Sequence, residues 1–144
     1  MLSLRRHLPN LMIAVAVVLI MIGAYAAVAF SESNVPKATW LKNPLPLTFQ
    51  GTPGRGGTVT SVTCNHSATG LTLNVHITKP DMIALTLAPN SFTCDSTPTI
   101  ITVTAACLVS GTLCRGNYQG TVRLRQSSNY RDIPANLQVD IAVT

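Results

Sequence analysis

From residue 47 onward, apolar and polar side chains alternate in short segments that Gly, Pro, Asn and Ser residues separate. Val122 and Leu124, for example, alternate with Arg123 and Arg125. Successive side chains of a strand point to opposite faces of its sheet, so this alternation predicts strands with one buried and one solvated face. About seven strands are expected, at residues 47–50, 58–64, 71–77, 82–87, 99–105, 118–125 and 133–143.

The last of these segments has the longest row of side chains expected to point inward. The row is made of Ile133, Ala135, Leu137, Val139, Ile141 and Val143. Pro134 has no backbone N–H to donate to a neighbouring strand, which predicts a sheet edge or a switch between sheets at that position. Short strands of this kind without a helical period predict an all-β, antiparallel β-sandwich.

The first 30 residues have a different pattern, in which Arg5 and Arg6 precede an apolar run from Leu11 to Phe30. About 20 apolar residues in a helix span the hydrocarbon core of a bilayer. Arginines before the run place the N-terminus in the cytoplasm and the rest of the chain outside. The run therefore predicts one N-terminal hydrophobic helix, either a membrane anchor or a cleaved signal peptide. Cleavage would follow a small-x-small sequence, at residues 27–29 or at residues 24–26.

These patterns divide the chain into three parts. Residues 1–30 are the signal peptide or anchor, residues 31–46 an extended linker and residues 47–144 the β-sandwich domain. Pro36 and Pro44 favour an extended path for the linker, because proline disfavours helix at its own position and at the one before it. A domain of roughly 100 residues buries only a modest core, so covalent cross-links would help to stabilise it.

The charged residues exclude few classes of function. The formal net charge is +5, but the basic residues are scattered, which does not indicate nucleic-acid binding. We interpret Arg123 and Arg125 as solvated; a salt-sensitive contact with an anionic surface polymer is the alternative. Catalysis needs a nucleophile, a base and an orienting acid placed together, and the outward-facing His76 has no acidic residue near it in sequence. We therefore expect neither catalytic activity nor a cofactor.

Four short motifs stand in a distinctive order along the domain. They are Leu47-Thr48-Phe49, Leu87-Ala88-Pro89-Asn90-Ser91-Phe92, Gly116-x-Tyr118-x-Gly120-x-Val122 and Ile133-Pro134-Ala135-x-Leu137-x-Val139. This order resembles bacterial immunoglobulin-like β-sandwich domains, including BACON-type and fibronectin type III-like domains of surface proteins. The resemblance implies an immunoglobulin-like fold, an extracellular or cell-surface location, and a tyrosine corner at Tyr118. The sequence departs from the family in having four cysteines and no tryptophan at Met82 or Ile83.

Cys64, Cys94, Cys107 and Cys114 form an even set in an exported domain, which predicts two disulfides rather than a metal site. Sequence alone allows three pairings. In an immunoglobulin-like sandwich, the first two cysteines lie at one end of the strands and the last two at the other. The ends are a strand length of roughly 20 Å apart, whereas a disulfide needs Cα atoms within about 7 Å. We therefore predict the pairs Cys64–Cys94 and Cys107–Cys114.

The exported domain has three candidate roles, all of them non-catalytic. It is a structural or adhesive module, held at the membrane if the N-terminal segment is uncleaved; or a filament subunit whose residues 31–46 add as a strand to a neighbouring copy; or a glycan-binding module. The expected partners are accordingly the membrane, other surface proteins, glycans or copies of itself. Asn65, followed by His66 and Ser67, is also a candidate N-glycosylation site.

Overall fold

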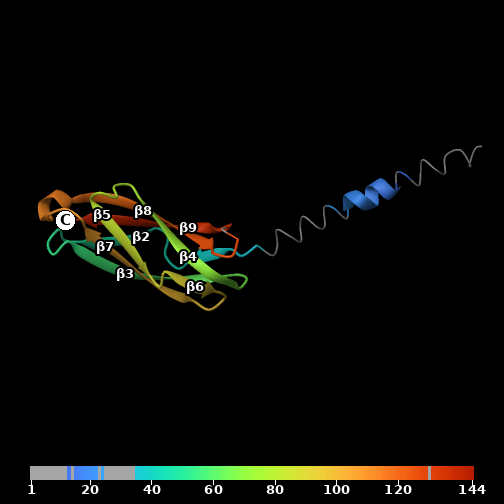
Figure 1. Ribbon diagram of the computed structural model, residues 1–144, viewed down its shortest axis with the longest axis horizontal. Coiled ribbons are helices and arrows are strands. Elements are labelled where there is room, and N and C mark those ends of the chain that lie inside the picture. The colour runs from blue at the N-terminus through green and yellow to red at the C-terminus, as the bar shows by residue number, and fades with distance from the viewer. Residues whose placement is uncertain (1–12, 14, 23, 25–34, 130) are drawn as a thin grey trace, which may run out of the picture. The chain divides into compact units, whose positions relative to one another are not determined.

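The computed structural model describes residues 13, 15–22, 24, 35–129 and 131–144. Residues 36–144 form a compact unit of two packed β-sheets (Figure 1). The strands are β1 (Ala38–Trp40), β2 (Leu45–Phe49), β3 (Arg55–Cys64), β4 (Ala68–Ile77), β5 (Ile83–Ala88), β6 (Ser91–Cys94), β7 (Thr99–Cys107), β8 (Gly116–Gln126) and β9 (Arg131–Val143), with a short 3₁₀ helix at Gly111–Cys114. One sheet has the order β1-β3-β7-β5 and the other the order β2-β9-β8-β4-β6. The predicted immunoglobulin-like β-sandwich is confirmed.

The core lies between the two sheets and consists of the side chains that the alternation predicts to point inward. Ile101 and Val103 of β7 and Val122 and Leu124 of β8 have no exposed surface. Thr102, between the first two, and Arg123, between the second two, are exposed. β-branched residues suit this arrangement because they pack well on a pleated, half-buried surface.

Tyr118 forms the tyrosine corner that the family resemblance implied. Its ring is 4% exposed, and its hydroxyl donates a hydrogen bond of 2.8 Å to the carbonyl oxygen of Cys114. The bond fixes the connection between β7 and β8 onto the core, at the end of the sandwich that holds the 3₁₀ helix.

In the N-terminal unit, residues 13, 15–22 and 24 are helical. Among the described residues, no helix is long and apolar enough to cross a membrane. The rest of the predicted signal peptide or anchor over residues 1–30 lies outside the described residues.

The linker expected over residues 31–46 differs from the structure, because its second half belongs to the sandwich. Residues 31–34 lie outside the described part, but β1 pairs with the end of β3, with Ala38 opposite Cys64. β2 pairs with the end of β9, with Leu45 opposite Val139, in the one parallel pairing among the described strands. The prolines suggested a linker, yet Pro46 sits on an edge strand, where a missing N–H is tolerated. β1 is one of two strands that the sequence pattern did not predict; β6 is the other.

A bulge in β9 also departs from the expected alternation. Val122 of β8 faces Leu137 and Leu124 faces Ile133, so Arg123 stands opposite the three residues Pro134–Asn136. Ala135, which was expected to point inward, is exposed and has a φ of 100°. The inward prediction for Ala135 is wrong because the extra residues leave the ladder and bend outward, at a proline that cannot donate to it.

Candidate functional site

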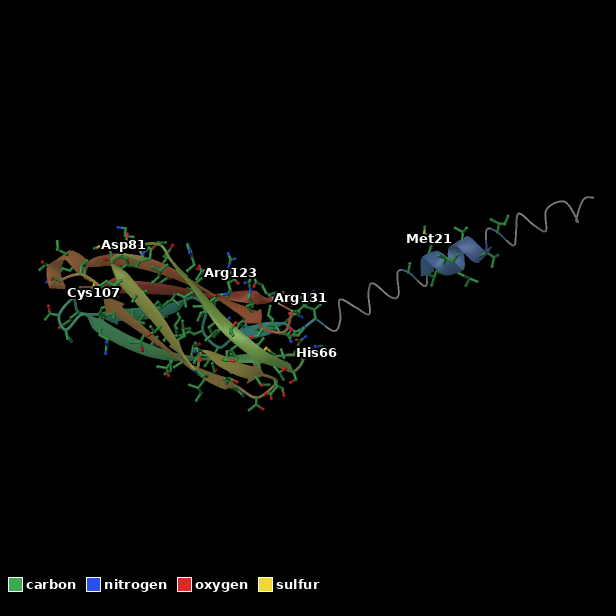
Figure 2. All side chains as sticks on the ribbon, in the orientation of Figure 1. Met21, His66, Asp81, Cys107, Arg123 and Arg131 are labelled. Carbon is green, nitrogen blue, oxygen red and sulfur yellow. A yellow bond between two sulfur atoms is a disulfide. The ribbon has the colours of Figure 1, made fainter. Side chains whose placement is uncertain are left out.

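The two disulfides brace opposite ends of the sandwich. Cys64 is bonded to Cys94 and Cys107 to Cys114, with Cα–Cα distances of 5.5 and 5.9 Å. These are the pairs that the strand map predicts. Figure 2 shows Cys107 at one end of the domain and His66, close to Cys64 in sequence, at the other. The first bond therefore joins the ends of β3 and β6 at one end of the sandwich, and the second joins the end of β7 to the 3₁₀ helix at the other.

Asn65, the candidate glycosylation site, lies in the exposed turn that follows β3. Its side-chain oxygen Oδ1 accepts a hydrogen bond of 2.6 Å from the backbone N–H of Lys37. Its own N–H donates to the carbonyl oxygen of Lys37 at 3.2 Å. Asn65 thus fixes the chain just before β1, and its modification stays a prediction.

The described part of the domain has a hollow of about 310 Å³ on the outer face of the five-stranded sheet. We call it the arginine groove. Its lining residues come from three neighbouring strands: Asn74, Val75 and His76 of β4, Arg123 and Arg125 of β8, and Asp132 of β9. Antiparallel pairing brings them together, since Asn74 faces Arg123 and Arg125 faces Asp132 across the strands. Figure 2 shows Arg123 between the two ends of the domain.

The two arginines of the groove have different partners. Arg125 Nε donates a hydrogen bond of 3.0 Å to Asp132 Oδ1, in an ion pair whose side chains are 41% and 45% exposed. Within the described residues, the guanidinium of Arg123 has no carboxylate at ion-pair distance and donates no hydrogen bond. Arg123 therefore offers its guanidinium donors to solvent or to a ligand.

The bulge in β9 determines what Arg123 faces on that side. On the β9 side, Arg123 faces the bulged residues instead of a regular cross-strand neighbour. The bulge itself is held by Trp40, the last residue of β1, and by Asn43, which lies between β1 and β2. Trp40 Nε1 donates to the carbonyl oxygen of Ala135 at 2.9 Å, and Asn43 Nδ2 donates to that of Asn136 at 2.9 Å. Asn43 Oδ1 accepts from the N–H of Gln138 at 2.9 Å, so Asn43 spans the end of the bulge.

A second hollow of about 310 Å³ lies at the end of the domain that holds the C-terminus. It is lined by Gln50, Gly51, Thr52, Gly111, Thr112, Arg115 and Thr144. Arg115 is the charged side chain among these residues, and glycine and threonine make up most of the rest. The lining residues bring no second charged side chain beside Arg115.

Stacking on aromatic side chains would be the usual route to glycan binding by such a domain. Among the described aromatic residues, Trp40, Phe49 and Tyr118 are buried and Phe92 is half-buried. Tyr130 lies outside the described residues. The described aromatic rings thus belong to the core or its margin, and polar side chains line the arginine groove instead.

No protein-family model matches the sequence, and no curated protein sequence matches it. Among solved structures, the chain is similar to a FixG-related protein from Vibrio parahaemolyticus, with a TM-score of 0.52 and 8% identity over 77% of this chain and 98% of that one. It is also similar to the CARDB domain of PF1109 from Pyrococcus furiosus (TM-score 0.47, 14% identity, 76% and 96% covered). A third similar structure contains domains 4 and 5 of the S-layer protein SbsC, with a TM-score of 0.45 and 13% identity. The match covers 75% of this chain but only about half, 51%, of that one. At these identities, the similarity to the FixG-related protein shows the fold alone, and the BACON-type assignment stays a prediction.

Proposed function

We propose that this chain is an exported, non-catalytic module of the cell surface or extracellular space, whose immunoglobulin-like domain has a structural or adhesive role. The observation that carries the proposal is the pair of disulfides, one at each end of the sandwich. Disulfides form and persist outside the reducing cytoplasm, and small exported domains use them to supplement a modest core. The arginines and the apolar run at the N-terminus support export independently.

The filament alternative, in which residues 31–46 add to a neighbouring copy, has an observation against it. β1 occupies the edge of β3 beside Val62–Cys64, and β2 occupies the edge of β9 beside Val139–Val143. Residues 38–40 and 45–46 would have to leave their own sheets, and bury Trp40 elsewhere, before they could join another copy. The single-domain surface module needs no such exchange.

Export is tested on the full-length chain with a C-terminal tag, expressed in a bacterial host. External protease should remove the tag in spheroplasts, and a maleimide-polyethylene glycol reagent should add to none of the four cysteines until the protein is reduced. A matched variant without residues 1–30 should stay inside and react at its cysteines without reduction. A protected tag together with free thiols in the full-length protein would overturn the proposal. The mass of the exported protein then tells a cleaved signal peptide from a retained anchor.

The exposed position of Asn65 makes it the proposed acceptor wherever the host has N-glycosylation machinery. Secretion from a eukaryotic host should then give a mass increase that Asn65→Gln abolishes and that Asn129→Gln, at an exposed asparagine outside a sequon, leaves unchanged.

A further inference from the structure

The arginine groove combines three features that a sheet face with no role beyond contact with solvent would not be expected to share. It is hollowed, it holds a guanidinium without a carboxylate partner among the described residues, and it lies beside an irregular stretch of backbone. The next cross-strand pair along β8 and β9 is regular: Thr121 of β8 donates to Gln138 Oε1 of β9 at 3.2 Å.

The bulge holds one residue, Ala135, in a strained backbone conformation, and other parts of the fold keep it there. An alanine at a φ of 100° is in a region that L-residues rarely adopt. Trp40 and Asn43 hold it there through bonds to Ala135 and Asn136 from more than 90 residues away in sequence. Bulges and strained residues held in this way are concentrated at sites where side chains must be re-aimed. Here the effect is to leave Arg123 without a cross-strand neighbour on β9.

We propose that the arginine groove binds an acidic sugar unit of an extracellular polysaccharide. Arg123 provides the carboxylate site, because a planar guanidinium matches the two oxygens of a carboxylate with two parallel donors. Asn74, directly opposite Arg123, adds an amide that both donates to and accepts from sugar hydroxyls. The proposal rests on the proposed function, since it supplies the ligand of an adhesive surface module.

The mixed charge of the lining favours a sugar acid over a bare anion. Asp132 Oδ1 is taken up by Arg125, and the remaining carboxylate lone pairs accept hydrogen bonds from hydroxyl groups. A free phosphate offers mainly negative oxygens, which Asp132 repels. A sugar acid presents both groups that the lining requires, a carboxylate for Arg123 and hydroxyls for Asp132. The ion pair already holds Arg125 and Asp132, so the Arg123 side chain is the main group of the groove that is ordered on binding.

The test is calorimetric titration of trigalacturonate into the full-length chain in a neutral detergent at low salt. We expect binding that Arg123→Gln weakens about tenfold or more, as for the loss of a charge-assisted hydrogen bond. Arg123→Lys should restore little of it, because lysine keeps the charge but not the paired donors. Arg55→Gln is the matched control: it removes the same charge from an exposed residue of β3 in the other sheet, and it should change the affinity less than twofold.

Neutral maltotriose should not bind, and inorganic phosphate at the same concentration should not displace trigalacturonate. Equal losses from Arg123→Gln and Arg55→Gln would mean attraction by overall charge and would overturn the proposal. Displacement by phosphate would overturn the choice of a sugar acid, and so would failure to bind trigalacturonate. Unchanged thermal unfolding of each variant shows that a loss of binding is not a loss of fold. Export and thiol protection are measured separately, so a failure here leaves the proposed function standing.

Discussion

At the scale of single residues, Thr60 carries a buried hydroxyl that has no hydrogen-bond partner in the described part of the chain. It lies on the inner face of β3 opposite Ile101 and is 4% exposed. An unsatisfied buried polar group costs about 1–3 kcal/mol. Thr60→Val replaces the hydroxyl with a methyl group of similar size, so we expect the free energy of unfolding to rise by about 1 kcal/mol.

Thermal unfolding followed by circular dichroism measures the effect, and a gain of that size raises Tm by roughly 4–8 °C in a domain of this length. Thr102→Val on the exposed face of β7 is the control and should change stability by less than about 0.5 kcal/mol. A lower Tm for Thr60→Val would show that the hydroxyl has a partner in solution.

The backbone conformation of Ala135 leads to a second prediction at this scale. At a φ of 100°, its Cβ is strained, and glycine adopts such angles freely. Strain of this kind costs about 1–3 kcal/mol, against about 0.5–1 kcal/mol of extra chain entropy lost by glycine, so Ala135→Gly should stabilise the domain by up to about 2 kcal/mol. Urea unfolding measures it. The control is Ala142→Gly in the regular part of β9, which should destabilise the domain.

At the scale of elements, β9 carries the register of the five-stranded sheet. It pairs with β8 along most of its length and with β2 beyond the bulge. After the bulge the alternation resumes, with Leu137 fully buried and Gln138 exposed. The two extra residues in β9 keep the parity, so Ile133 and Leu137 stay on the same face.

This register predicts opposite outcomes for neighbouring substitutions. Leu137→Ala should cost about 2–5 kcal/mol, including the cavity it leaves in the core. Gln138→Ala should change stability by less than about 0.5 kcal/mol. Urea unfolding of both variants compares them directly. If Gln138→Ala were the damaging change and Leu137→Ala the silent one, the strand would be shifted by one residue.

At the scale of the whole molecule, two cross-links at opposite ends supplement a modest core. The Cys64–Cys94 bond spans 30 residues and the Cys107–Cys114 bond 7, and the chain-entropy model gives them about 3.7 and about 2.5 kcal/mol. Since domains have total stabilities of about 5–15 kcal/mol, each bond is a large fraction of the whole.

Replacing Cys64 and Cys94 by alanine should therefore lower the urea midpoint more than replacing Cys107 and Cys114. Peptide mapping without reduction should recover the intact bond in each variant and both bonds in the parent protein. The opposite order of midpoints would mean that strain or structure in the unfolded chain outweighs loop length.

The sequence by itself determined seven of the nine described strands and most of their inward faces. Alternation is a local property: the side chains around Ile101 and Val122 point in or out according to backbone geometry that each strand carries with it. The pairs Cys64–Cys94 and Cys107–Cys114 needed one further premise, the immunoglobulin-like arrangement that puts the members of each pair at the same end of the strands.

Only the tertiary structure decided β1, β6, the bulge and the groove. β1 is a strand because it pairs with the edge of β3. The local sequence of Ala38–Trp40 has no pattern that predicts this pairing. The outward turn at Ala135 depends on bonds from Trp40 and Asn43, which lie far away along the chain. Arg123 is marked by the sequence only as an outward arginine. Among the described residues it has no carboxylate partner, and on the β9 side this depends on which residues the neighbouring strand places opposite it. That is a property of three-dimensional pairing and not of the residue itself.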